Sequence, residues 1–60
     1  MNEIKNILIN KARELYKDIE PCSNRSELSE CFTKEGDMLL LWFNTSDNST
    51  HVISADLNLY

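Results

Sequence analysis

Asp37-Met38-Leu39-Leu40-Leu41-Trp42-Phe43-Asn44 is the stretch that decides the fold. Six consecutive large apolar residues stand between two polar ones, and no other part of the sequence is comparably apolar. A run of this length between turn-forming residues fits a buried strand or part of a buried helix. The Trp-Phe pair that closes it and the Gly36-Asp37 pair that precedes it favour a strand. Because side chains alternate along a strand, this stretch has two faces, formed by Met38, Leu40 and Trp42 and by Leu39, Leu41 and Phe43.

Size and charge narrow the possible functions. Sixty residues make one domain, residues 1–60, and a chain this short is only marginally stable by itself. Its composition, 42% hydrophobic with a single Gly and a single Pro, is that of a folded domain. The net charge is −4, which argues against partners that select clustered Lys and Arg. We therefore expect no nucleic-acid partner and no anionic membrane surface.

The sequence carries no visible targeting segment. Residues 1–6 lack the basic-then-apolar order of a secretory signal. The longest apolar run, residues 38–43, is far shorter than the ~20 residues that span a bilayer. We expect a cytoplasmic protein whose cysteines stay reduced.

The N-terminal part predicts one amphipathic helix over residues 3–19. Apolar residues recur there at spacings of three and four, which places them on one stripe: Ile4, Ile7, Leu8, Ala12, Leu15 and Ile19. Pro21 disfavours helical geometry at the residue before it and is expected to end the helix. A short helical turn is predicted around residues 25–30, where Asn24 and Glu27 have the spacing of a capping box.

The C-terminal half predicts a β-meander. A short strand over residues 31–34 leads through a tight turn at Glu35-Gly36 into the apolar strand. The polar segment Asn44–Ser49 forms the next turn, and a third strand runs from Thr50 to about Asp56, or as far as Leu59. In that strand apolar and polar residues alternate, with Val52 as the exception. The predicted fold is α+β, one N-terminal amphipathic helix packed on a three-stranded antiparallel β-meander.

Such a fold has more apolar surface than one helix can cover. The helix shelters one face of the sheet, which leaves three large side chains of the central strand on the other. Burying a group of this kind is worth about 1.5–3 kcal/mol relative to exposure. Since the pattern does not tell which face meets the helix, all six residues are candidates for an interface: Met38, Leu40, Trp42, Leu39, Leu41 and Phe43.

The uncovered face has three candidate covers. A second copy of the chain is the simplest, because a two-fold interface needs only a self-complementary patch. The segment Cys22–Glu30 or the tail Asp56–Tyr60 would be an intramolecular cover. The third is another protein. Trp42 is either the centre of the core or an anchor of such an interface.

Cys22, Cys31 and His51 are the residues that most invite a chemical role. As zinc ligands they number three, whereas structural sites use four, and nine positions separate the two cysteines. A disulfide between them requires an oxidising compartment. A dyad of His51 as base and Cys31 as nucleophile also needs an orienting group and a pocket, for which this small chain offers little material. We expect no metal, no cofactor and no enzymatic activity.

No motif identifies a family. The sequence predicts a protein–protein interaction module, most simply a homodimer that associates through the second face of its sheet. The alternative is an acidic inhibitor or antitoxin-like protein that binds a basic partner, which the negative charge favours.

Overall fold

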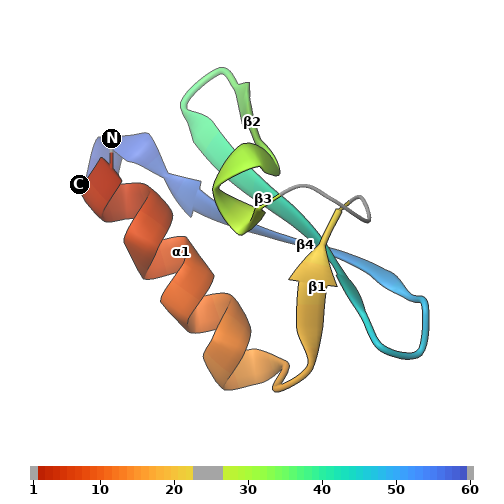
Figure 1. Cartoon of the computed structure of the whole chain (residues 1–60). Helices are drawn as coiled ribbons and strands as arrows, with labels where there is room; N and C mark the ends of the chain where they lie inside the picture. Colours follow the sequence, from red (N-terminus) through yellow and green to blue (C-terminus); the bar gives the residue numbers. More distant parts are fainter. Residues whose placement is uncertain (1, 23–26, 60) are drawn as a thin grey trace.

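The computed structural model describes residues 2–22 and 27–59 and confirms the α+β class (Figure 1). One α-helix is followed by an antiparallel sheet with two short 3₁₀ helices. The elements are α1 (Asn2–Leu15), β1 (Ile19–Pro21), η1 (Leu28–Glu30), β2 (Phe32–Glu35), β3 (Met38–Thr45), β4 (Thr50–Asp56) and η2 (Leu57–Leu59). No helix in these two ranges is long and apolar enough to cross a membrane.

The apolar stretch is β3, the centre of the sheet, and it pairs with all three other strands. β4 runs along one edge of it, from Asp56 opposite Met38 to Thr50 opposite Asn44. The other edge is divided between two strands. β2 occupies the end near Met38 and β1 the end near Thr45. The predicted meander is therefore present, with β1 as an additional strand that extends the edge begun by β2.

The prediction for the end of the helix is wrong. The helix was expected to continue to residue 19, but α1 ends at Leu15, and Ile19 opens β1 opposite Thr45. Ile19 fits the helical stripe by spacing, yet its β-branched side chain suits a strand equally well. Pairing with β3 decides between helix and strand at Ile19. A hydrogen bond from the Ser46 hydroxyl to the Asp18 carboxylate ties the segment between α1 and β1 to the turn after β3.

The turn between β2 and β3 lies one residue later than predicted. Glu35 pairs with Met38, so the two-residue loop is Gly36-Asp37. Gly36 has φ +57°, a conformation that only glycine adopts without strain, and this fixes it inside the loop. The predicted helical turn over residues 25–30 is present as η1 at residues 28–30, while residues 25 and 26 lie outside the described part of the chain.

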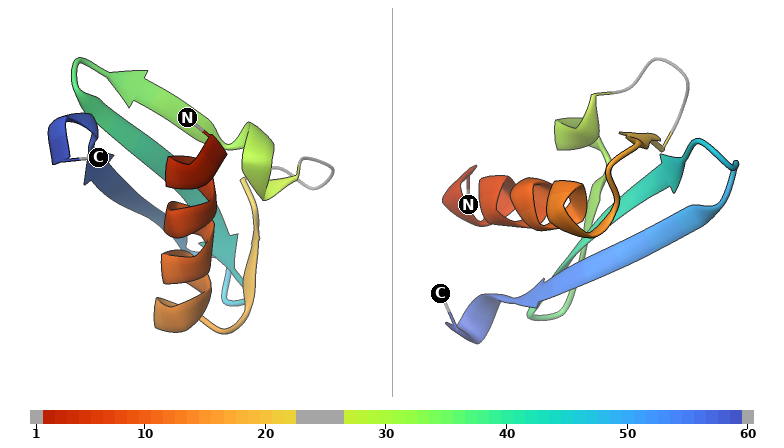
Figure 2. Two further views of the ribbon diagram at one scale, coloured as in Figure 1. Left: turned by 90° about the vertical axis from the view of Figure 1, so that its left-hand side faces the viewer. Right: turned by 90° about the horizontal axis from the view of Figure 1, so that it is seen from below.

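The core lies between α1 and one face of the sheet, here called the inner face (Figure 2). The buried apolar residues are Leu8, Ala12, Cys31, Leu39, Leu41, Phe43 and Ala55. Leu41 and Phe43 are 0% exposed. The structure thus answers the question that the sequence left open, since Leu39, Leu41 and Phe43 are the side chains of β3 that meet the helix.

The turn between β3 and β4 is held by Asp47. Its carboxylate accepts hydrogen bonds from the Thr45 hydroxyl and from the backbone N–H of Ser49, the latter at 3.1 Å. These bonds, the one from Thr45 first, lower the pKa of Asp47 below its ordinary value. Asn48 has φ +68°, which Asn tolerates better than most residues. The polar composition of this segment therefore serves the turn itself.

Candidate interaction surface

The face of the sheet turned away from α1, here called the outer face, carries four neighbouring apolar residues. Met38, Leu40 and Trp42 alternate with the buried positions of β3, and Val52 lies opposite Trp42 on β4. The side chains of Met38, Trp42 and Val52 are 36%, 38% and 46% exposed, and Leu40 is partly buried. We call these four residues the outer patch.

The outer patch contains half of the six candidate interface residues. Met38, Leu40 and Trp42 lie in it, whereas the other three are buried against the helix and form no free surface. Val52 was not among the candidates. The signal that identifies it is that it breaks the apolar–polar alternation of its strand, as an apolar residue at an outer position.

The described parts of the two proposed covers reach only the margin of the outer patch, where Cys22 and Glu30 lie beside Trp42 and Asp56 pairs with Met38. Leu28 of η1 and Leu57 of η2 pack against the inner core instead. Leu59 is 79% exposed. Residues 23–26 and 60, which belong to these two segments, lie outside the described part of the chain.

Trp42 is held in place at the centre of the outer face and is not a core residue. Its indole N–H donates a hydrogen bond of 2.8 Å to the hydroxyl of Thr33 on β2. Val52 is the partner of Trp42 in the register of β4, on the edge of β3 opposite to β2. A large aromatic side chain that is already fixed loses little conformational entropy when a partner covers it. Trp42 therefore has the properties of an interface anchor.

A hollow of about 460 Å³ opens beside the indole. It lies where β1 gives way to β2 along the edge of β3, so its wall combines strand and loop residues. The residues that line it are Cys22, Glu30, Cys31, Phe32, Thr33, Trp42, Asn44 and Thr50. The lining includes two aromatic residues, two cysteines and one glutamate, a combination that suits a side chain with an apolar stem and a positive end.

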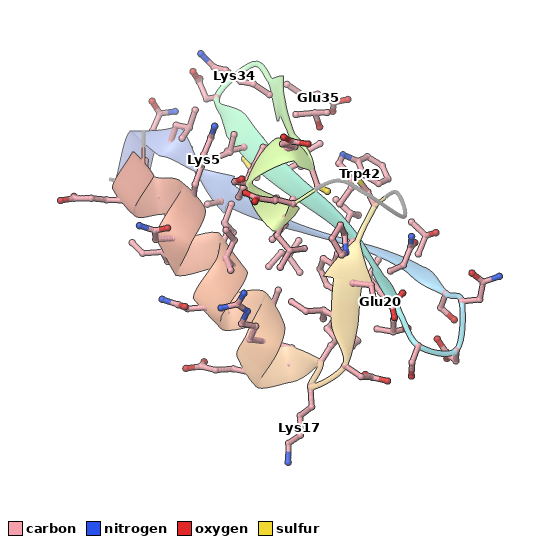
Figure 3. All side chains as sticks on the ribbon, in the orientation of Figure 1. Lys5, Lys17, Glu20, Lys34, Glu35 and Trp42 are labelled. Carbon is pink, nitrogen blue, oxygen red and sulfur yellow. The ribbon has the colours of Figure 1, made fainter. Side chains whose placement is uncertain are left out.

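Charge is distributed unequally between the two sides of the sheet. Among the described residues, the outer positions of the strands carry Glu20, Glu35 and Asp56 and no Lys or Arg. In Figure 3, Glu20, Glu35 and Trp42 lie on the side away from α1. The described basic residues are on or just after the helix or at an inward position of β2: Lys5, Lys11, Arg13, Lys17 and Lys34. The outer face is thus apolar at its centre and acidic at its perimeter.

The two cysteines meet beside Trp42. The register of β1 places Cys22, the residue after Pro21, next to Trp42, and the register of β2 places Cys31 there too. The backbone N–H of Trp42 donates a hydrogen bond of 3.0 Å to the Cys31 carbonyl. The backbone N–H of Cys22 donates a hydrogen bond of 3.1 Å to the Cys31 sulfur. Burial, followed by a hydrogen bond with the Cys22 thiol, raises the pKa of Cys31. Cys22 is exposed and Cys31 is buried.

His51 does not join the cysteines. It lies on β4, along the opposite edge of β3, where its ring is 4.4 Å from that of Tyr16 and 5.7 Å from that of Phe43 between centroids. Its Nε2 is 3.3 Å from the Thr45 hydroxyl. Within residues 2–22 and 27–59, no three His, Cys, Asp or Glu side chains are grouped as a metal site would require. His51 therefore forms part of the aromatic packing between the helix and the sheet.

The fold and its outer face define a class, a small α+β domain that presents an apolar, acid-rimmed sheet face to solvent. The chain matches no protein-family model, no curated protein and no solved structure. The geometry and charge of this face are therefore the grounds on which a function is proposed.

Proposed function

We propose that the protein is a non-enzymatic interaction module that binds a basic protein through its outer face. The partner presents an apolar side chain to the outer patch and Lys or Arg residues to the carboxylates around it. The observation that carries this proposal is the placement of Trp42, fixed and partly exposed at the centre of an acidic face. A cytoplasmic location belongs to the same proposal.

The area of a typical protein–protein interface is larger than the outer patch, so the interface also includes residues around the patch. A specific interface covers about 800 Å² on each partner. The whole surface of this protein measures 4354 Å², so such an interface takes roughly a fifth of it. The outer patch alone is too small for that, because its side chains are already half-buried or more. A partner that covers the patch therefore also covers part of its surroundings, where Glu20, Glu35 and Asp56 lie.

A second copy of the chain matches this charge pattern poorly. Glu35 and Asp56 flank Met38 at one end of the sheet, and Glu20 lies at the other end beside Asn44. A two-fold axis along the strands would stack Glu35 on Asp56 of the other copy. An axis across the strands would stack Glu35 on Glu20. Juxtaposed like charges oppose association, whereas Lys and Arg in these places assist it.

The hollow beside Trp42 adds specificity to the proposed contact. A partner's Arg or Lys that enters it places its alkyl stem along the indole and brings its charge toward Glu30. An acidic protein that covers a basic site in this way would act as an inhibitor of the partner whose site it occupies. The mode of action is thus the acidic inhibitor or antitoxin-like function that the net charge favours.

Two synthetic peptides of one alternating pattern test the proposal, one built from Leu and Lys and the other from Leu and Glu. Calorimetric titration is expected to show binding of the Leu/Lys peptide that weakens at least tenfold from low to high salt. The Trp42→Thr variant is expected to lose at least tenfold in affinity. Leu15→Thr is the matched control, since it removes a 60% exposed apolar residue from the helix side.

Three results contradict the proposal. One is equal binding of the Leu/Glu peptide, and another is unchanged affinity of Trp42→Thr while circular dichroism shows both variants folded. The third is a dimer in light scattering that Trp42→Thr dissociates and Leu15→Thr does not. This last result would mean that the outer face binds a second copy of the chain instead of a basic partner.

A further inference from the structure

We propose that Cys22 and Cys31 form a reversible thiol–disulfide pair that reacts with small disulfides of the glutathione type. The buried Cys31 and the exposed Cys22 meet at the same position of the sheet edge, beside Trp42. The chain leaves the sheet at one cysteine and returns at the other, so oxidation would close the intervening segment into a ring.

The backbone of Cys22 is already in direct contact with the thiol of Cys31. The N–H nitrogen of Cys22 is 3.1 Å from the Cys31 sulfur. Since an N–Cα bond is about 1.46 Å long, the Cα of Cys22 is no more than about 4.6 Å from that sulfur. The antiparallel pairing of both flanking strands with β3 maintains this proximity.

The two thiols differ in a way that assigns their roles. Cys22 is exposed and can meet a small disulfide in solution. Cys31 is 3% exposed, accepts the Cys22 N–H and donates its own proton to the Glu27 carbonyl at 3.5 Å. A buried thiol does not react first with an external reagent, but it is positioned to attack a sulfur bonded at Cys22. Cys22 is therefore the attacking residue and Cys31 the resolving one.

The reaction with glutathione disulfide proceeds in two exchanges. The Cys22 thiolate bonds to one glutathione sulfur, the glutathione S–S bond breaks, and one glutathione leaves as a thiolate that takes up a proton. The Cys31 thiolate, its proton lost to solvent, then bonds to the Cys22 sulfur and expels the second glutathione, which is protonated in turn. Two protein thiols are oxidised to one disulfide, and one glutathione disulfide is reduced to two thiols.

The state of this pair also bears on the hollow beside Trp42, whose wall includes both cysteines. A disulfide there would fix the wall of the hollow and alter what enters it, a consequence that rests on the proposed function. The formation of the disulfide does not rest on it. Disulfide formation and peptide binding are therefore measured in separate experiments. The disulfide proposal and the proposed function can then fail independently.

The test is equilibration of the wild-type chain in glutathione buffers of graded redox ratio, followed by acid quenching, alkylation and intact-mass measurement. The expected product is a monomer that has lost two hydrogen atoms and carries no alkyl group. Its fraction is expected to follow the ratio of squared glutathione to glutathione disulfide, as a two-electron exchange requires. The fluorescence of Trp42, the single tryptophan, is expected to fall in parallel because of the adjacent disulfide.

Single substitutions separate the two roles. Cys31→Ser is expected to accumulate the mixed disulfide of glutathione with Cys22, while Cys22→Ser is expected to stay unmodified as long as it is folded. Cys31→Ala repeats the first experiment without placing a hydroxyl in the core. The proposal is overturned if the wild type accumulates the mixed disulfide as Cys31→Ser does, if only intermolecular disulfides form, or if the two thiols react independently.

Discussion

Replacing Leu41 and Leu40 separately by Ala tests the assignment of faces from which the outer patch follows. The two residues are adjacent in β3 and chemically identical, yet their side chains point to opposite sides of the sheet. Leu41 is 0% exposed within the core, while Leu40 is partly buried on the outer face. A difference in the cost of the two substitutions therefore reports burial and not residue type.

The expected magnitudes follow from these positions. Removing a fully buried Leu side chain costs about 3 kcal/mol, because contacts are lost and a cavity is left. On the outer face solvent fills the space, so Leu40→Ala is expected to cost about 1 kcal/mol. A domain of this size has a total stability of roughly 3–9 kcal/mol. Leu41→Ala thus approaches the limit of folding, and Leu40→Ala does not.

Urea unfolding followed by Trp42 fluorescence measures both effects. With a slope of about 1 kcal/mol per molar urea, the midpoint should fall by about 3 M for Leu41→Ala and by about 1 M for Leu40→Ala. A Leu41→Ala chain that is unfolded without urea agrees with the expectation. Equal midpoints, or a lower midpoint for Leu40→Ala, would refute the assignment of faces and with it the outer patch.

Three further predictions concern the Asp47 carboxylate, the backbone at Gly36 and the Cys22–Cys31 pair. Asp47 has a lowered pKa in the folded state, so its ionised form stabilises the fold above its ordinary pKa of 3.8, and this contribution is lost as the pH falls through the folded-state value. The difference in melting temperature between wild type and Asp47→Asn should accordingly be largest near neutrality and vanish in acid; a constant difference contradicts it. Gly36→Ala should cost about 1 kcal/mol in urea unfolding from its positive φ alone, since nothing lies within 4 Å of the added Cβ, and Gly36→Asn should cost less. Closing the ring from Cys22 to Cys31 should add roughly 2.7 kcal/mol to the free energy of unfolding, and Cys22→Ser treated with the same oxidant should show no gain.

The sequence was sufficient to predict the order of elements where the signal is local. The apolar run between polar stops predicted the start of β3 and its end to within two residues, since Asn44 and Thr45 were assigned to the turn but belong to the strand. The alternating segment after the turn predicted β4. The end of the helix could not be predicted from local sequence signals. Ile19 satisfies both a helical stripe and a strand, and the choice depends on pairing with Thr45, which lies far along the chain.

The candidate site was predictable only in part for a related reason. A strand that is apolar on both faces does not reveal which face meets the helix, so three buried residues entered the list of candidates with three outer ones. The proximity of the cysteines was hidden as well. It arises because two strands share one edge of β3, and the spacing of nine residues between Cys22 and Cys31 gives no sign of that arrangement.

The outer patch has no evident purpose within the fold itself. The ladder of β3 is made by backbone groups, and the inner side chains already provide the core. Threonine would suit an outer strand position as well as Met38 or Trp42 does, since it combines high strand propensity with solubility. A marginally stable chain that instead exposes three large apolar side chains accepts a risk of aggregation. Carboxylates lie at both ends of the same face and would oppose its stacking on another copy, which is why we propose a partner of opposite charge for this apolar surface.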